Sequence, residues 1–198
     1  MSRKKNDLFC VHGPDNAEHE IRKAYHEVIK TSVVYSWIAR SIQAVNPKEM
    51  TETYHHSYQC FAAKNRLAAE RWARTAKHLA QAFQHEAKIA YIEENVELLP
   101  YLEGAHDEEY GLHERSDTTA DLLNSVATHI PPGLKEMPEN MQRYLARARY
   151  HLKKLENIEE KHELLRAERI QVAHEYGRAL ECMALGYEAE FKTKPKAA

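Results

Sequence analysis

The chain has 198 residues, which is enough for one domain with a hydrophobic core and too few to suggest two. Its formal net charge of −2 gives no bulk attraction to nucleic acid or to an anionic membrane, so neither is expected as a partner. The three cysteines are odd in number and widely spaced, which excludes a disulfide framework and favours a reducing, cytoplasmic location.

The predicted organisation is one helical domain between two short tails. Its parts are a flexible N-terminal tail over 1–14, a helical-bundle domain over 15–191 and a flexible C-terminal tail over 192–198. At the start of the domain, apolar or small residues recur from Ile21 to Val45 at alternating steps of three and four. This pattern predicts a long helix with one packing seam, which Pro47 ends.

Two further long segments lack strong helix breakers. Residues 48–99 are rich in alanine, which favours helix formation and lets a neighbouring helix approach closely, and Pro100 closes the segment. A short helix is predicted over 117–129, and a third long helix over 138–191. Helix rise gives lengths of roughly 50 Å, 78 Å and 80 Å for the long helices and roughly 20 Å for the short one.

The predicted fold is therefore all-α, an elongated antiparallel bundle of three long helices and one short helix. A rod of this shape has much surface for its core, so self-association along the helices, in the manner of a coiled coil, is expected. Trp37 lies off the seam of the first helix and is the predicted contact to a partner. Cys60 lies among apolar residues and is interpreted as a core residue.

Glutamate and histidine residues suggest a metal site as an alternative. The chain contains, in order, Glu18, Glu52 with His55, Glu94, and Glu159 with His162. This order resembles the Glu, Glu-x-x-His, Glu, Glu-x-x-His pattern of ferritin-like di-iron proteins, and the resemblance implies a carboxylate–histidine iron centre. Within one helix, however, Glu52 and Glu94 would be ~60 Å apart and could not share that centre.

The predicted packing of the bundle would still bring another set of glutamate and histidine residues together. Folding the chain at Pro47 brings Glu18 level with His78, and an antiparallel last helix brings Glu159 and His162 to the same height. The candidate metal ligands are therefore Glu18, His78, Glu159 and His162. Carboxylate and imidazole ligands together suit iron, manganese or zinc.

A third interpretation comes from the stretch between Arg169 and Gly177. Arg169 and His174 have the Arg-x4-His spacing of HEPN-type RNA-cleaving domains, and the resemblance covers this one short motif. It implies cleavage of RNA with His174 as a catalytic residue. The favoured expectation remains a non-catalytic helical protein that acts through self-association or through a protein partner.

Overall fold

The computed structural model describes residues 16–38, 47–98, 112–159 and 162–193. Its elements are α1 (Ala17–Ile38), α2 (Lys48–Ala62), α3 (Arg66–Glu94), the 3-10 turn η2 (Val96–Leu98), α5 (Leu112–Ala127), α6 (Glu139–Lys154), the 3-10 turn η3 (Leu155–Asn157) and α7 (Glu163–Thr193). The described residues contain no strand, so the all-α prediction is confirmed. None of the described helices is long and apolar enough to cross a membrane.

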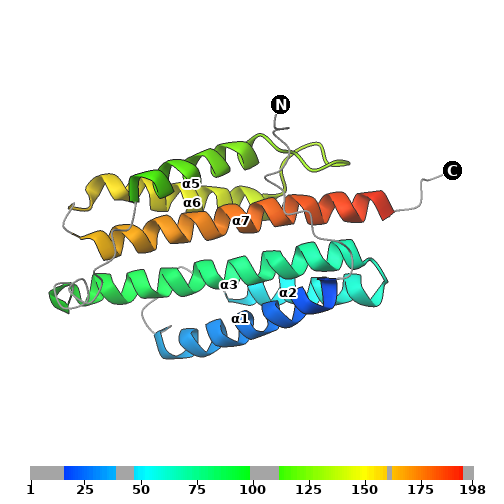
Figure 1. The fold of residues 1–198 in the computed structure, drawn as a ribbon, viewed down its shortest axis with the longest axis horizontal. Coiled ribbons are helices and arrows are strands. Elements are labelled where there is room, and N and C mark those ends of the chain that lie inside the picture. The colour runs from blue at the N-terminus through cyan, green and yellow to red at the C-terminus, as the bar shows by residue number, and fades with distance from the viewer. Residues whose placement is uncertain (1–15, 39–46, 99–111, 160–161, 194–198) are drawn as a thin grey trace, which may run out of the picture.

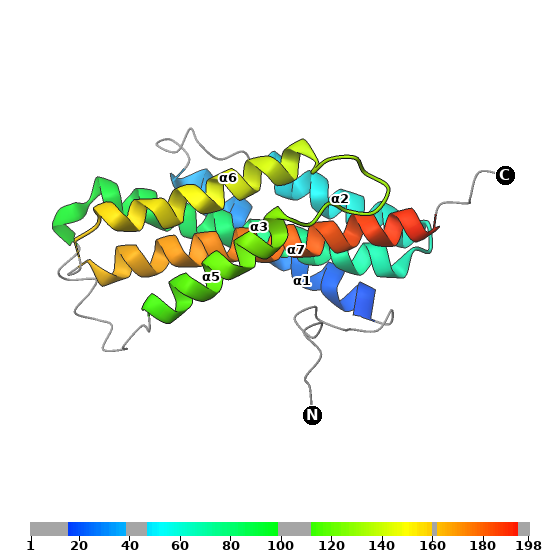
Figure 2. The same cartoon turned by 90° about the horizontal axis from the view of Figure 1, so that it is seen from above.

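The helices α3 and α7 form the central pair of an elongated bundle (Figure 1). The helices α1 and α2 pack on the α3 side, whereas α5 and α6 cover α7, as the view from above shows (Figure 2). Buried alanines line much of α3, including Ala69, Ala73, Ala76 and Ala80. Their small side chains allow α1 and α7 to approach this helix closely, as the sequence predicted.

The prediction of one helix over 48–99 was wrong, because the chain turns back between α2 and α3. Lys64 has a left-handed φ of 61°. The amide of Asn65 donates to the carbonyl of Cys60 and that of Lys64 to Phe61, which together form a Schellman motif. The side chain of Asn65 then caps α3 by accepting from the amide of Ala68 at 3.2 Å.

The third long helix is also interrupted. It divides into α6 and α7, and the connection contains η3 and an extended residue, Ile158. Arg166 in the first turn of α7 donates to the Ile158 carbonyl at 3.4 Å, which holds this connection against the helix. As a result α3 and α7, with 29 and 31 residues, are each only about 45 Å long. The expected rods of roughly 80 Å are therefore absent from the part of the chain that is described.

The predicted domain, residues 15–191, ends close to the limits of the described residues on both sides. The predicted N-terminal tail lies outside the described residues, which begin at Asn16. At the other end α7 continues to Thr193, two residues beyond the predicted domain boundary, and residues 194–198 are outside the description. The short helix was predicted over 117–129 and is observed as α5, which starts five residues earlier.

Candidate metal centre

The residues predicted as one metal site lie in separate places. Glu18 is exposed at the start of α1, where it pairs with Arg22 at 2.6 Å. Glu159 and His162 belong to the connection between α6 and α7, because the helix expected there is broken. The starts of α1 and α7 lie toward opposite ends of the bundle (Figure 1). The structure therefore does not bring Glu18 together with Glu159 and His162.

His78 has a different partner from those expected. Its Nδ1 lies 2.7 Å from Oε2 of Glu175, which links α3 to α7. Burial lowers the pKa of His78, although the adjacent Glu175 favours the protonated form. Burial acts in the opposite direction on Glu175, but the hydrogen bond and charge of His78 leave the pKa of this carboxyl below its usual value. His78 and Glu175 thus form a buried hydrogen-bonded pair that joins α3 to α7.

Trp37 and Arg169, which the sequence singled out, lie on α1 and α7. Trp37 lies in the last turn of α1, and its side chain is outside the described residues. Arg169 is buried, pairs with Glu93 and donates toward Nδ1 of His151 at 3.3 Å. These contacts give Arg169 a structural role between α7 and its neighbours. The described residues thus offer no observation in favour of the RNA-cleaving interpretation.

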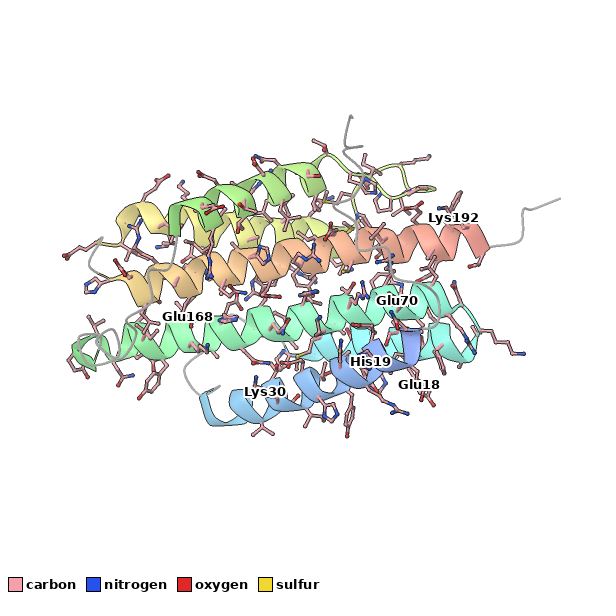
Figure 3. The ribbon with its side chains drawn as sticks, in the orientation of Figure 1. Glu18, His19, Lys30, Glu70, Glu168 and Lys192 are labelled. Carbon is pink, nitrogen blue, oxygen red and sulfur yellow. The ribbon has the colours of Figure 1, made fainter. Side chains whose placement is uncertain are left out.

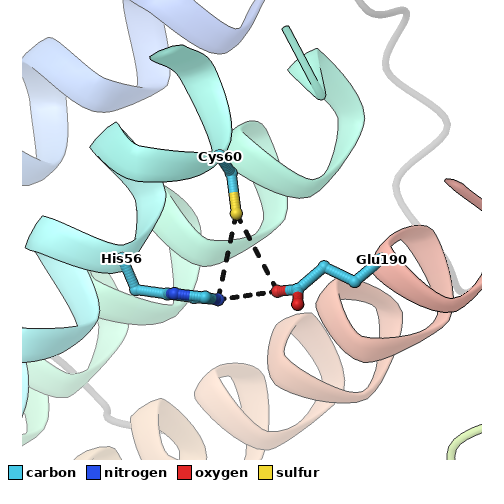
Figure 4. A group of neighbouring side chains, drawn as sticks. All are labelled: His56, Cys60 and Glu190. Carbon is cyan, nitrogen blue, oxygen red and sulfur yellow. Dashed lines mark hydrogen bonds and ion pairs between the residues drawn. The ribbon is translucent and has the colours of Figure 1, made fainter. Parts of the chain in front are cut away.

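The described residues bring one set of three potential metal ligands together, and it was not predicted. His56 and Cys60 lie on α2, and Glu190 lies near the end of α7 (Figure 4). Their spacing of four residues puts His56 and Cys60 on one face of α2. The carboxylate of Glu190 approaches that face from the neighbouring helix. We refer to His56, Cys60 and Glu190 as the α2–α7 triad.

The distances within the α2–α7 triad are close to those of a metal site. Sγ of Cys60 is 3.8 Å from Nε2 of His56 and 3.8 Å from Oε1 of Glu190. Standard bond lengths to zinc place a sulfur and a nitrogen or oxygen ligand about 3.6 Å apart in a tetrahedral site. Nε2 of His56 and Oε1 of Glu190 are hydrogen-bonded at 2.6 Å and would need to separate by about 0.8 Å. Only a small side-chain adjustment is thus required.

The indole of Trp72 contacts two members of the triad. Nε1 of Trp72, on α3, donates to Oε1 of Glu190. The same indole contacts the His56 ring edge-on, with ring centroids 4.8 Å apart. Trp72 itself fits against α7 because position 186 is glycine, where an added Cβ would lie 2.9 Å from Cε2 of the indole. Such hydrogen bonds from a second layer orient metal ligands in known metalloproteins.

The three side chains differ in exposure. Cys60 is buried at 8% exposure, whereas the side chains of His56 and Glu190 are 40% and 28% exposed. Burial, together with the nearby Glu190 carboxylate, raises the pKa of the Cys60 thiol to about 11. Without a metal this thiol stays protonated near neutral pH, so it is not an activated nucleophile. The partly exposed imidazole and carboxylate leave an approach from solvent for an ion.

No family model matches the chain, and no curated protein or solved structure is significantly similar to it.

The raised thiol pKa makes a testable prediction about pH. A zinc ion coordinated by Cys60 would bind the thiolate, so its binding would displace at least the one proton that Cys60 carries. Because the thiol pKa is about 11, the thiolate fraction grows about tenfold for each pH unit between pH 7 and pH 9. Calorimetric titrations across this range are expected to show zinc affinity rising at least that steeply. In Cys60→Ser this contribution to the slope disappears, and a flat profile in the unmodified protein would contradict the thiolate assignment.

Proposed function

We propose that this protein is a zinc-binding helical bundle whose metal site is the α2–α7 triad. The observation that supports this proposal is the convergence of His56, Cys60 and Glu190, whose ligand atoms all lie within 4.8 Å of one another. A thiol, an imidazole and a carboxylate form a ligand set that zinc accepts readily. The ferritin-like resemblance implies a ligand set without a thiol. The presence of the Cys60 thiol in the triad favours zinc over iron or manganese.

The position of the triad suggests what the ion does. The helix α2 packs mainly on α3 and α1, so a metal ion would add a direct link between α2 and the last turns of α7. Three protein ligands leave one tetrahedral position for water or for a ligand from another molecule. We therefore infer an exchangeable site that stabilises the docking of α2 and responds to zinc availability.

The proposal is tested by the metal content of untagged protein. Elemental analysis of protein purified after expression with added zinc is expected to give about one zinc per chain, and almost none in His56→Ala. His162→Ala is the matched control, because it removes a histidine of the originally predicted set that lies outside the triad. Retention of zinc by His56→Ala together with its loss in His162→Ala would contradict the proposal.

A second candidate function, self-association, is supported by the outer face of α1. Tyr25, Ile29 and Val33 are spaced four residues apart and are 48%, 47% and 54% exposed. The predicted interface residue Trp37 continues the same spacing along the sequence. A row of large apolar side chains on one helix face is typical of a contact between protein chains. We propose that a second copy of this chain covers it.

The expected result is a dimer whose stability depends on this face of α1. Ile29→Glu is expected to weaken dimerisation at least about tenfold, because it buries an unpaired charge in the contact. Lys30→Glu is the control, since this neighbouring side chain is 62% exposed. The solution mass measured by light scattering over a dilution series checks the prediction, and a monomeric unmodified protein at high concentration would contradict it.

A further inference from the structure

The hydrogen bonds of Asn65 connect two members of the α2–α7 triad, Cys60 and Glu190. Asn65 lies in the turn between α2 and α3 and caps α3. Its backbone amide donates to the carbonyl of Cys60 at 2.9 Å, which fixes this turn against the end of α2. Its side-chain Nδ2 donates to Oγ1 of Thr193, in the last turn of α7, at 2.9 Å. One residue therefore bonds to both helices that supply the triad.

The connection continues from Thr193 to Glu190 through the hydroxyl group of Thr193. This hydroxyl donates to the carbonyl of Glu190 at 3.0 Å, and it lies 3.3 Å from the carbonyl of Ala189. A hydroxyl oxygen can accept one hydrogen bond while its proton is donated in another, so both bonds can exist together. A chain of hydrogen bonds thus runs from the Cys60 carbonyl through Asn65 and Thr193 to the Glu190 carbonyl.

The cap on α3 decides how the Asn65 amide is oriented. Its Oδ1 accepts from the backbone amide of Ala68 at 3.2 Å. Because that position needs an acceptor, the other end of the planar amide, Nδ2, is the end that faces Thr193. The donor to α7 is therefore held in place by α3.

A cavity of ≈ 510 Å³ lies beside this chain of hydrogen bonds. Its lining includes Cys60, Asn65, Glu190 and Thr193. The helix α2 packs mainly on α3 and α1 rather than on α7. Since side chains do not fill this space, hydrogen bonds rather than close packing fix the spacing between the ends of α2 and α7.

We infer that Asn65 is a positioning residue that sets the separation of Cys60 and Glu190. Its effect on metal binding rests on the proposed zinc site, where it acts through two ligands and is not a ligand itself. Sγ of Cys60 and Oε1 of Glu190 are 3.8 Å apart, close to the separation of about 3.6 Å expected at zinc. Losing an outer contact that orients ligands typically weakens metal binding roughly 10- to 100-fold.

The inference is tested by competition titration of the full chain with zinc and a chelator. Asn65→Ser keeps the cap on α3, but its side chain is too short to reach Thr193. Thr193→Val removes the acceptor and leaves Asn65 unchanged. Each variant is expected to weaken zinc binding about tenfold, the lower end of the usual range, because Thr193 is exposed.

Two further variants of the last turn of α7 serve as controls. Thr193→Ser retains the hydroxyl group and is expected to bind zinc within about twofold of the unmodified protein. Lys192, labelled in Figure 3, precedes Thr193 and forms an exposed ion pair with Glu188 at 2.6 Å. Lys192→Gln is expected to change zinc affinity by less than about twofold.

Urea denaturation in EDTA separates positioning from a general effect on stability. Asn65→Ser is expected to unfold at nearly the same urea concentration as the unmodified protein, because serine is also a good helix cap. A lower midpoint combined with unchanged zinc affinity would overturn the inference and leave Asn65 with a capping role alone.

Alkylation of Cys60 by iodoacetamide in EDTA, followed by peptide mass spectrometry, judges the inference without zinc. Asn65→Ser and Thr193→Val are expected to speed this reaction by about twofold to tenfold, the range that corresponds to one net hydrogen bond. Lys192→Gln is expected to leave the rate unchanged. The expected rates in a protein that takes up no zinc would support the role of Asn65 while the proposed function fails. Unchanged rates in Asn65→Ser and Thr193→Val would overturn the inference.

Discussion

Saturating zinc is expected to raise the melting temperature of the protein by about 8–16 °C. A ligand that binds only the folded state at about 1,000 times its dissociation constant contributes about 4 kcal/mol of stability. For domains of about 150–250 residues, 1 kcal/mol corresponds to roughly 2–4 °C. The measurement compares scanning calorimetry of protein with zinc against protein with EDTA, at pH 7.5. The shift follows from a site that joins α2 to α7 only in the folded chain.

Four variants show whether this shift in melting temperature comes from the α2–α7 triad. Cys60→Ser and Glu190→Gln each remove or weaken one ligand of the α2–α7 triad and are expected to lose most of the shift. Glu159→Gln and His162→Ala alter the connection between α6 and α7 and are expected to retain it. If all four variants kept the full shift, zinc would be stabilising the protein from another site.

Removing the buried carboxylate of Glu86 is expected to cost about 3–5 kcal/mol of unfolding free energy. Glu86, on α3, accepts from Arg147 at 2.8 Å and from Nε2 of His151 at 3.2 Å, both on α6. Arg169 of α7 in turn donates to Nδ1 of His151. Nε2 of His151 thus faces the Glu86 carboxylate and Nδ1 faces the Arg169 guanidinium. One carboxylate thus links three helices, and Glu86→Ala removes the buried acceptor that Arg147 and His151 share.

Urea denaturation checks the Glu86 prediction, with equal slopes required for a direct comparison of stability. Glu94→Ala is the matched control, because Glu94 lies on the same helix and is exposed. It is expected to change the unfolding free energy by less than about 0.5 kcal/mol. A loss below about 1 kcal/mol in Glu86→Ala would show that the buried network contributes little to stability.

The sequence predicted the all-α class correctly, but it did not predict where the helices begin and end. Apolar periodicity and the absence of strand patterns were sufficient for the all-α class. The break between α2 and α3 was missed because Lys64 occupies the left-handed position that glycine usually fills in a Schellman motif. The break before α7 was missed because the stretch from Glu156 to His162 contains neither glycine nor proline.

The wrong helix boundaries led to a wrong set of predicted metal ligands. With one continuous helix over 48–99, the register placed Glu18, Glu159 and His162 at the height of His78. Once α2 folds back on α3, His56 and Cys60 come beside the end of α7. The four-residue spacing of His56 and Cys60 was visible in the sequence and could have indicated half of the site. Glu190 could not have been found, because its position depends on how α7 packs.

X-ray absorption at the zinc edge of the one-to-one complex reports directly which atoms bind the ion. Zinc held by the α2–α7 triad is expected to show one sulfur near 2.3 Å with nitrogen and oxygen ligands at about 2.0–2.2 Å, and loss of the sulfur signal in any zinc that Cys60→Ser retains. A first shell of nitrogen and oxygen alone in the unmodified protein would contradict the assignment of the α2–α7 triad as the zinc site.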